Sequence, residues 1–102
     1  MIQSYAGSYP YNKDSITRYA SDKLGVYYVG YLKGDNLVTM YVGRAAGNGV
    51  SIKSRLLNHL SQDYWPEVSS FGFSVCDTKT EAENLEAQEI NRLKPPYNRT
   101  GK

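Results

Sequence analysis

The sequence predicts an α+β domain built on a small three-stranded antiparallel sheet flanked by helices, in the order β-β-α-β-α. Two apolar and aromatic runs, 26–32 and 37–42, flank a polar turn, which is the pattern of a β-hairpin. A third run, 70–76, alternates larger and smaller side chains as a strand does. Amphipathic segments follow the hairpin and the third run, and their apolar residues have helical spacing.

The hairpin is predicted from residue types as well as from the pattern. Tyrosine, valine, leucine and threonine suit a half-buried pleated surface, and the turn at 33–36 contains residues that tolerate positive φ angles. Because side chains alternate between the faces of a strand, we expect one apolar face, with Tyr41 on the other. The two expected sets are Leu37, Thr39 and Tyr41 against Val38, Met40 and Val42.

The first helix is predicted to run from Ile52 to Leu60. Ser51 precedes it as an N-cap, because a serine oxygen can accept a hydrogen bond from an unpaired N–H of the first turn. Arg55 and His59 are four residues apart and therefore lie on one edge of this helix. The apolar stripe consists of Ile52, Leu56, Leu57 and Leu60.

The second helix is predicted to start at a capping box, Thr78 with Glu81 or Thr80 with Glu83, and to end before the two prolines at 95 and 96. Its apolar face contains Glu86 among aliphatic residues. An ionised carboxylate on a buried face needs a cation or a water-filled cleft. Alternatively, Glu86 is a partly exposed residue at the edge of a short helix.

Composition limits the chain to one domain of 102 residues, with 40% hydrophobic and 22% charged residues. No apolar run approaches the length of a membrane span, and the first residues are too polar for a signal peptide. The single cysteine, Cys76, excludes an internal disulfide and a multi-thiolate zinc site, so we expect a small core residue in a cytoplasmic protein. Residues 1–24 are expected to form an irregular arm that packs on the sheet edge or mediates self-association, and residues 14–23 within it could form a short helix or a strand.

The formal net charge is only +2, but its distribution is uneven. Four bases and no acids lie between residue 92 and the end of the chain, after a glutamate-rich segment. A basic tail at 99–102 favours a polyanionic partner, although a solvated terminus gives the same pattern. We therefore divide the chain into an arm (1–24), a domain (25–98) and this tail.

The order of the motifs resembles that of the GIY-YIG nuclease domain over residues 25–98. A Gly-Val-Tyr strand is followed by a Tyr-Val-Gly strand, an Arg-x-x-x-His helix, a third strand, a helix with Glu-x-x-x-Ile-x-x-Leu, and Pro-Pro-Tyr-Asn. Val26 and Val42 stand where isoleucine is usual, and Arg44 stands where lysine is frequent. The matching functional residues are Tyr27, Tyr41, Arg55, His59, Glu86 and Asn98.

This resemblance implies hydrolysis of a DNA phosphodiester bond with one divalent ion, Mg²⁺ or Mn²⁺. Magnesium prefers oxygen ligands and is often held by one or two carboxylates, so Glu86 is the expected protein ligand. Arg55 carries a planar, permanent charge that suits a phosphate oxygen. Additional DNA contacts are predicted for Arg44, Lys53 and Arg99.

The general base stays open between two residues. The resemblance implies Tyr27, with Tyr41 positioning water or phosphate, but a tyrosine titrates near pH ~10 and needs a cationic neighbour to act at neutral pH. His59 is the rival, because its reference pKa is about 6.5. Asn98 is expected to fix local geometry or to contact substrate.

Two other functions compete with the nuclease. One is a catalytically silent nucleic-acid-binding module of the same fold, and the other is a protein–protein interaction domain unrelated to nucleic acid. A domain of this size reaches only a short stretch of DNA, so we also expect weak sequence selectivity, a homodimer or a separate specificity partner.

Overall fold

The computed structural model describes residues 4–47, 49–62 and 68–100, and it has the α+β architecture expected. The predicted β-β-α-β-α order holds for the central elements, but the sheet has four antiparallel strands in the order β1-β4-β2-β3, not three. The elements are β1 (Ala6–Pro10), α1 (Lys13–Tyr19), β2 (Gly25–Lys33), β3 (Asn36–Ala45), α2 (Ile52–Gln62), β4 (Ser70–Val75), α3 (Lys79–Leu93) and α4 (Pro96–Thr100).

The additional strand comes from the segment expected to be an irregular arm, and that expectation is wrong for residues 6–10. α1 corresponds to the short helix that is one of the two alternatives for residues 14–23. β1 pairs with β4 along the sheet edge, so the segment does pack where one alternative placed it. The Tyr9 ring stacks on Tyr19 with centroids 4.5 Å apart and lies 5.5 Å from Phe71. Aromatic contacts of this kind contribute about 0.5–1.5 kcal/mol each beyond simple burial.

The β2–β3 hairpin forms as predicted, but a bulge changes which side chains share a face. Val29 pairs with Tyr41 and the next residue, Gly30, pairs with Thr39, so Met40 is the extra residue. Thr39 consequently lines the same side of the sheet as Tyr28, while Tyr41 packs in the opposite cluster. The expected grouping of Thr39 with Tyr41 is therefore wrong.

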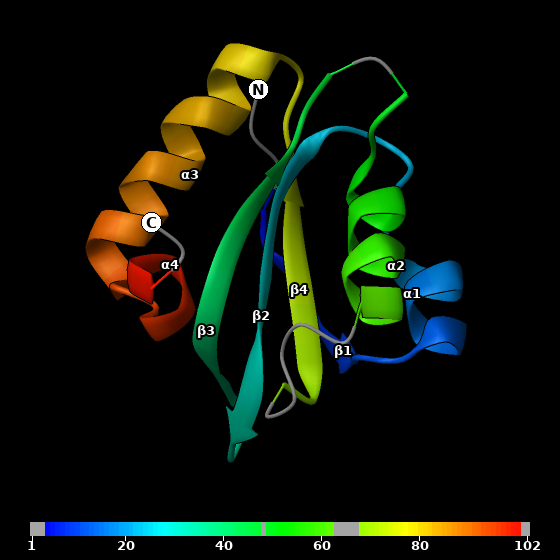
Figure 1. Cartoon of the computed structure of the whole chain (residues 1–102), viewed down its shortest axis with the longest axis vertical. Helices are drawn as coiled ribbons and strands as arrows, with labels where there is room; N and C mark the ends of the chain where they lie inside the picture. The colour runs from blue at the N-terminus through cyan, green and yellow to red at the C-terminus, as the bar shows by residue number, and fades with distance from the viewer. Residues whose placement is uncertain (1–3, 48, 63–67, 101–102) are drawn as a thin grey trace.

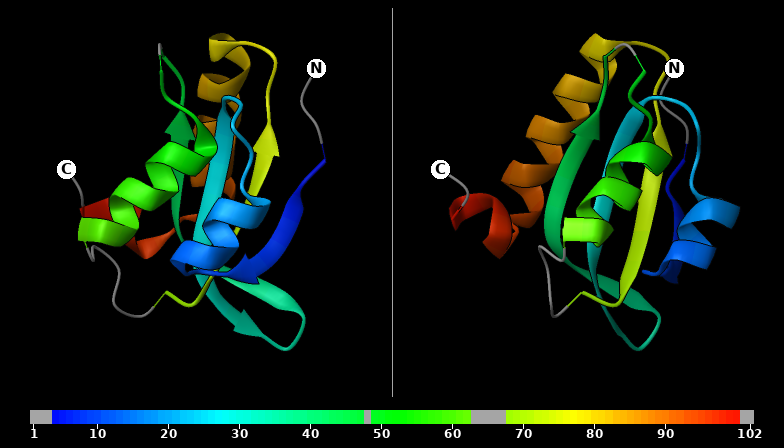
Figure 2. Two further views of the ribbon diagram at one scale, coloured as in Figure 1. Left: turned by 90° about the vertical axis from the view of Figure 1, so that its right-hand side faces the viewer. Right: turned by 45° about the vertical axis from the view of Figure 1, so that its right-hand side comes forward.

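Helices cover both faces of the sheet, with α1 and α2 on one side and α3 on the other (Figure 1; Figure 2). Under α1 and α2 the core contains Ile16, Ile52 and Leu56. Under α3 it contains Val26 and Val42 with Cys76, which is a buried free thiol as expected. Consecutive residues of β2 therefore serve different cores.

The predicted helix starts are confirmed. The Ser54 N–H donates to Ser51 Oγ at 3.0 Å, and the Glu81 N–H donates to Thr78 Oγ1 at 3.1 Å. α3 ends at Lys94, which adopts the left-handed conformation (φ 48°) before the prolines.

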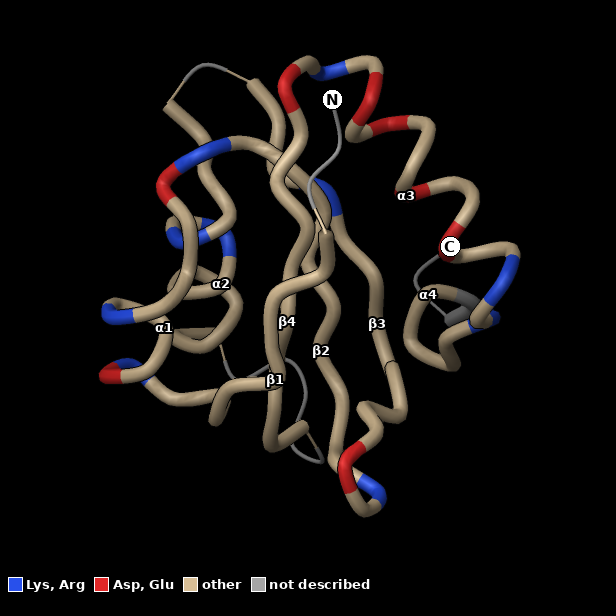
Figure 3. The backbone as a smooth tube through the Cα atoms, turned by 180° about the vertical axis from the view of Figure 1, so that it is seen from behind, with Lys and Arg blue, Asp and Glu red and all other residues tan. Residues whose placement is uncertain are grey.

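Acidic positions recur along α3 and basic positions follow at its end, as the sequence indicated (Figure 3). Of the helices in the described part of the chain, none has the length and apolarity that a membrane span requires. Trp65 lies outside the described residues.

Candidate active site

A buried tyrosine–histidine pair lies between β2 and α2. The Tyr27 side chain is fully buried and His59 is 8% exposed, and the Tyr27 hydroxyl lies 2.8 Å from His59 Nε2. The Tyr41 ring from β3 is centred 6.2 Å from Tyr27 and 6.1 Å from His59. Three predicted site residues from three separate elements therefore meet.

Two glycines make room for this cluster. Gly43 is paired with Tyr27 across the hairpin, and a Cβ atom on Gly43 would lie 2.2 Å from Cζ of the Tyr27 ring. A Cβ atom on Gly25 would lie 2.2 Å from the Ser74 carbonyl oxygen and 2.9 Å from Cδ1 of Ile52. The glycines of the Gly-Val-Tyr and Tyr-Val-Gly strands are thus needed for close packing around Tyr27, a role that sequence analysis did not assign.

Arg55 joins the cluster from α2. Its guanidinium interacts with the Tyr27 hydroxyl and acts electrostatically on Tyr41. Its Nε is buried and has no hydrogen-bond partner among the described residues. Because buried donors are rarely left unpaired, an ordered water or a bound ligand would have to supply the acceptor for this N–H.

Burial sets the protonation states of the pair. It raises the pKa of Tyr27 well above its usual value, with a further contribution from Tyr41, while Arg55 opposes the shift. Burial, and then the Arg55 charge, lower the pKa of His59 to about 4. At neutral pH His59 is therefore uncharged, and in the tautomer with its proton on Nδ1, Nε2 accepts the hydrogen bond from the Tyr27 hydroxyl.

This arrangement predicts a pH-dependent stability. The pKa of His59 in the folded chain, about 4, lies below the ordinary histidine value of 6.5, so the imidazole takes up a proton on unfolding between these pH values. The stabilisation is complete above pH ~6.5 and falls by up to about 3 kcal/mol as the pH approaches 4. Denaturant unfolding of wild type and His59→Gln at pH 7.5 and 4.5 measures this change in the free energy of unfolding. Equal pH dependence in the two proteins would show that His59 is not responsible.

Glu86 lies on α3 with a side chain that is 22% exposed, and its Oε1 accepts a hydrogen bond from Arg44 Nη1 at 3.0 Å. The carboxylate also contributes to the raised pKa of Tyr41, after burial, and to that of Tyr27. Glu86 therefore lies near the phenols. It is paired with a cation, which is one of the two environments expected for a carboxylate on the apolar face of this helix. Arg44, predicted to contact DNA, is that cation.

Glu86 is the predicted metal ligand. Within the described residues, no three His, Cys, Asp or Glu side chains gather as a metal site. A magnesium ion that keeps most of its waters would need only one carboxylate from the protein, and Glu86 is the residue that would hold it. In this structure Glu86 Oε1 is bonded to Arg44.

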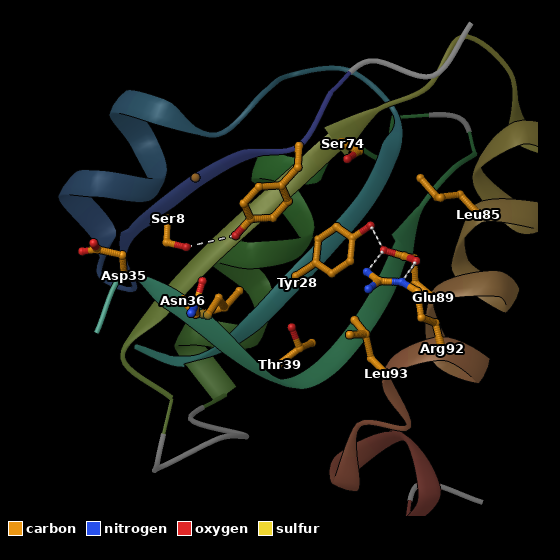
Figure 4. Close-up of a pocket in the computed structure, with 13 residues that line it drawn as sticks. Ser8, Tyr28, Asp35, Asn36, Thr39, Ser74, Leu85, Glu89, Arg92 and Leu93 are labelled. Atoms are coloured by element: carbon orange, nitrogen blue, oxygen red, sulfur yellow. Dashed lines mark hydrogen bonds and ion pairs between the residues drawn. The ribbon is translucent and has the colours of Figure 1, made fainter. Parts of the chain in front are cut away.

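Glu89 belongs to another part of the molecule. It lines a pocket of about 490 Å³ on the α3 side of the sheet, where it accepts hydrogen bonds from Tyr28 at 2.8 Å and from Arg92 at 2.7 and 2.8 Å (Figure 4). This network gives Glu89 a structural role on the α3 side of the sheet. Tyr27 and Tyr28, adjacent in sequence, thus point to different sites.

Asn98 binds the backbone of β3 at the outer edge of the sheet. Its amide accepts from Val42 N–H at 2.8 Å and donates to the Val42 carbonyl at 2.9 Å. These two bonds pair the backbone N–H and carbonyl of Val42 on the edge strand β3, as a neighbouring strand would. Of the two expected roles, the contacts seen correspond to fixing local geometry.

Loss of this amide should destabilise the domain without touching the phenols. Asn98→Ala leaves the Val42 N–H and carbonyl without their partner, which should lower the free energy of unfolding by about 1–3 kcal/mol. Asn91→Ala, at an exposed position of α3, is the matched control. Chemical denaturation measures both, and equal losses would contradict a specific role for the Asn98 amide.

The remaining predicted DNA contacts lie outside this cluster or are not described. Lys53 Nζ pairs with Asp22 at 3.4 Å, and the Arg99 side chain is not among the described ones. Comparison of the chain with protein-family models, curated proteins and solved structures finds no match. Function is therefore argued from the geometry of this site.

Proposed function

We propose that the chain is a divalent-metal-dependent DNA endonuclease that hydrolyses phosphodiester bonds. The observation that carries the proposal is the cluster of two phenols, an imidazole and a guanidinium from β2, β3 and α2, with the Glu86 carboxylate of α3 acting electrostatically on both phenols. Arg55, whose buried Nε lacks an acceptor among the described residues, is suited to a phosphate oxygen. Glu86 supplies the carboxylate for the ion.

The Tyr27–His59 pair supplies the general base in this mechanism. An attacking water gives a proton to the Tyr27 oxygen while Tyr27 passes its own proton to His59 Nε2. The products are hydroxide, which attacks phosphorus, a neutral Tyr27 and a protonated His59. This relay uses the 2.8 Å hydrogen bond and needs no free phenolate, which the raised pKa of Tyr27 makes scarce at neutral pH.

Substrate binding favours this proton transfer. In the free protein the Arg55 charge helps to hold the pKa of His59 down, after burial. A phosphate bound to Arg55 would offset that charge and raise the pKa of His59. Tyr41, beside both rings, would position the water or the phosphate. A divalent ion at Glu86, when bound, would stabilise negative charge on the leaving oxygen.

Parallel binding and cleavage measurements test the proposal against a catalytically silent binding module. Labelled single-stranded, duplex and branched DNA are incubated with and without magnesium, and both affinity and products are recorded. We expect salt-dependent binding with magnesium-dependent cleavage of at least one form. Binding without cleavage of any form would support the silent module, and absence of binding would support a protein–protein interaction domain.

A further inference from the structure

Arg44 and Glu86 form an ion pair where a metal is proposed to bind. Arg44 lies opposite Val26 in the hairpin, and Val26 belongs to the cluster beneath α3. The Arg44 side chain is 39% exposed, and Glu86 is its only hydrogen-bond partner in the described part of the chain. The guanidinium is therefore bonded to one carboxylate and is partly exposed to solvent.

A divalent ion and this guanidinium compete for the same carboxylate. The 3.0 Å contact engages Glu86 Oε1, one of the two oxygens available to an ion. An ion on either oxygen of Glu86 would lie close to the guanidinium, and the two cations would repel each other, because partly buried charges are screened less than those in water. Binding of the ion would therefore weaken the contact.

We infer that Arg44 is an internal counter-cation. It holds Glu86 in place before the metal binds, and metal binding releases its guanidinium to bind a DNA phosphate. The inference rests on the proposed function and extends it. After release, the permanently charged guanidinium of Arg44 has free donors in a planar fork that suits phosphate. Metal and DNA should then bind cooperatively, and each should raise the affinity of the other by the same factor.

Manganese affinity in the absence of DNA is the first test, measured as free Mn²⁺ by electron paramagnetic resonance. The variants are Arg44→Gln, Glu86→Gln and the matched control Arg92→Gln, which frees Glu89 on the same helix. We expect Arg44→Gln to bind Mn²⁺ about 1.5- to 5-fold more tightly, which corresponds to the strength of a partly exposed ion pair. Arg92→Gln should leave the affinity unchanged, and Glu86→Gln should abolish specific binding.

The outcomes separate this inference from the proposed function. Unchanged or weaker Mn²⁺ binding by Arg44→Gln, or an equal gain in Arg92→Gln, would overturn the role of Arg44 while leaving the metal site standing. If Glu86→Gln binds Mn²⁺ as wild type does, the proposed metal site itself fails.

The Arg44 side-chain N–H signal in nuclear magnetic resonance gives a second readout. Magnesium should shift this signal in wild type but not in Glu86→Gln. A signal that stays in place while magnesium binds at Glu86 would contradict release of Arg44.

Discussion

Tyr27→Phe should reduce the single-turnover rate of DNA cleavage by about 10²–10⁴-fold, the usual contribution of a general acid–base group. The variant keeps the buried ring but removes the oxygen that bonds to His59 at 2.8 Å. Because that oxygen both takes the proton of the water and passes one on, DNA binding should change little. Rapid-quench cleavage with saturating protein measures the chemical step.

Tyr28→Phe provides a control at the adjacent position. It makes the same chemical change, but the lost hydrogen bond is to Glu89 in the pocket on the other side of the sheet. We expect a modest loss of stability and a cleavage rate close to that of wild type. If Tyr27→Phe cleaved within about threefold of Tyr28→Phe, far from the usual effect of such groups, the proton relay would be wrong.

Arg55→Lys should also be severely impaired, by about 10²–10³-fold in the single-turnover rate. Lysine keeps the charge but loses the planar fork, including the buried Nε donor proposed to contact phosphate. Arg92→Lys makes the same exchange in the Glu89 ion pair, away from the phenols, and should cleave normally. A cleavage rate for Arg55→Lys near that of Arg92→Lys would show that charge alone suffices at position 55.

The central elements could be predicted because their local signals agree with their tertiary setting. Ser51 and Thr78 cap the helices that follow them, and 70–75 is a strand as its alternation indicated. Alternating large residues of β4 fill one core, while the small residues between them face the other side. β4 is buried on both faces, so its alternation in sequence predicts which side chains enter each core and not which are exposed.

β1 and the bulge could not be predicted because neither has a local signal. Ala6–Pro10 contains glycine, serine and proline, which are poor strand formers, and it is ordered by pairing with β4 and by the stacking of Tyr9. The bulge at Met40 breaks an alternation that the sequence continues without interruption. Both features depend on partners distant in the chain.

The site residues came from the resemblance, but their contacts did not. Tyr27 and His59 are 32 residues apart, and only the fold brings them to hydrogen-bonding distance. Arg44 was expected on DNA, yet in the structure it binds Glu86. Long-range pairs of this kind leave no periodic mark in one sequence. The sequence left the general base open between Tyr27 and His59. In the proposed mechanism the proton passes through Tyr27 to His59, so both residues take part.

Nicking of supercoiled plasmid tests the central claim most directly. Wild type, Glu86→Gln and wild type with excess chelator are incubated with plasmid under the same conditions, and the relaxed form is quantified over time. We predict accumulation of nicked circles only for wild type with free magnesium or manganese. Equal nicking by Glu86→Gln, or nicking that persists with the chelator, would contradict a metal-dependent endonuclease centred on Glu86.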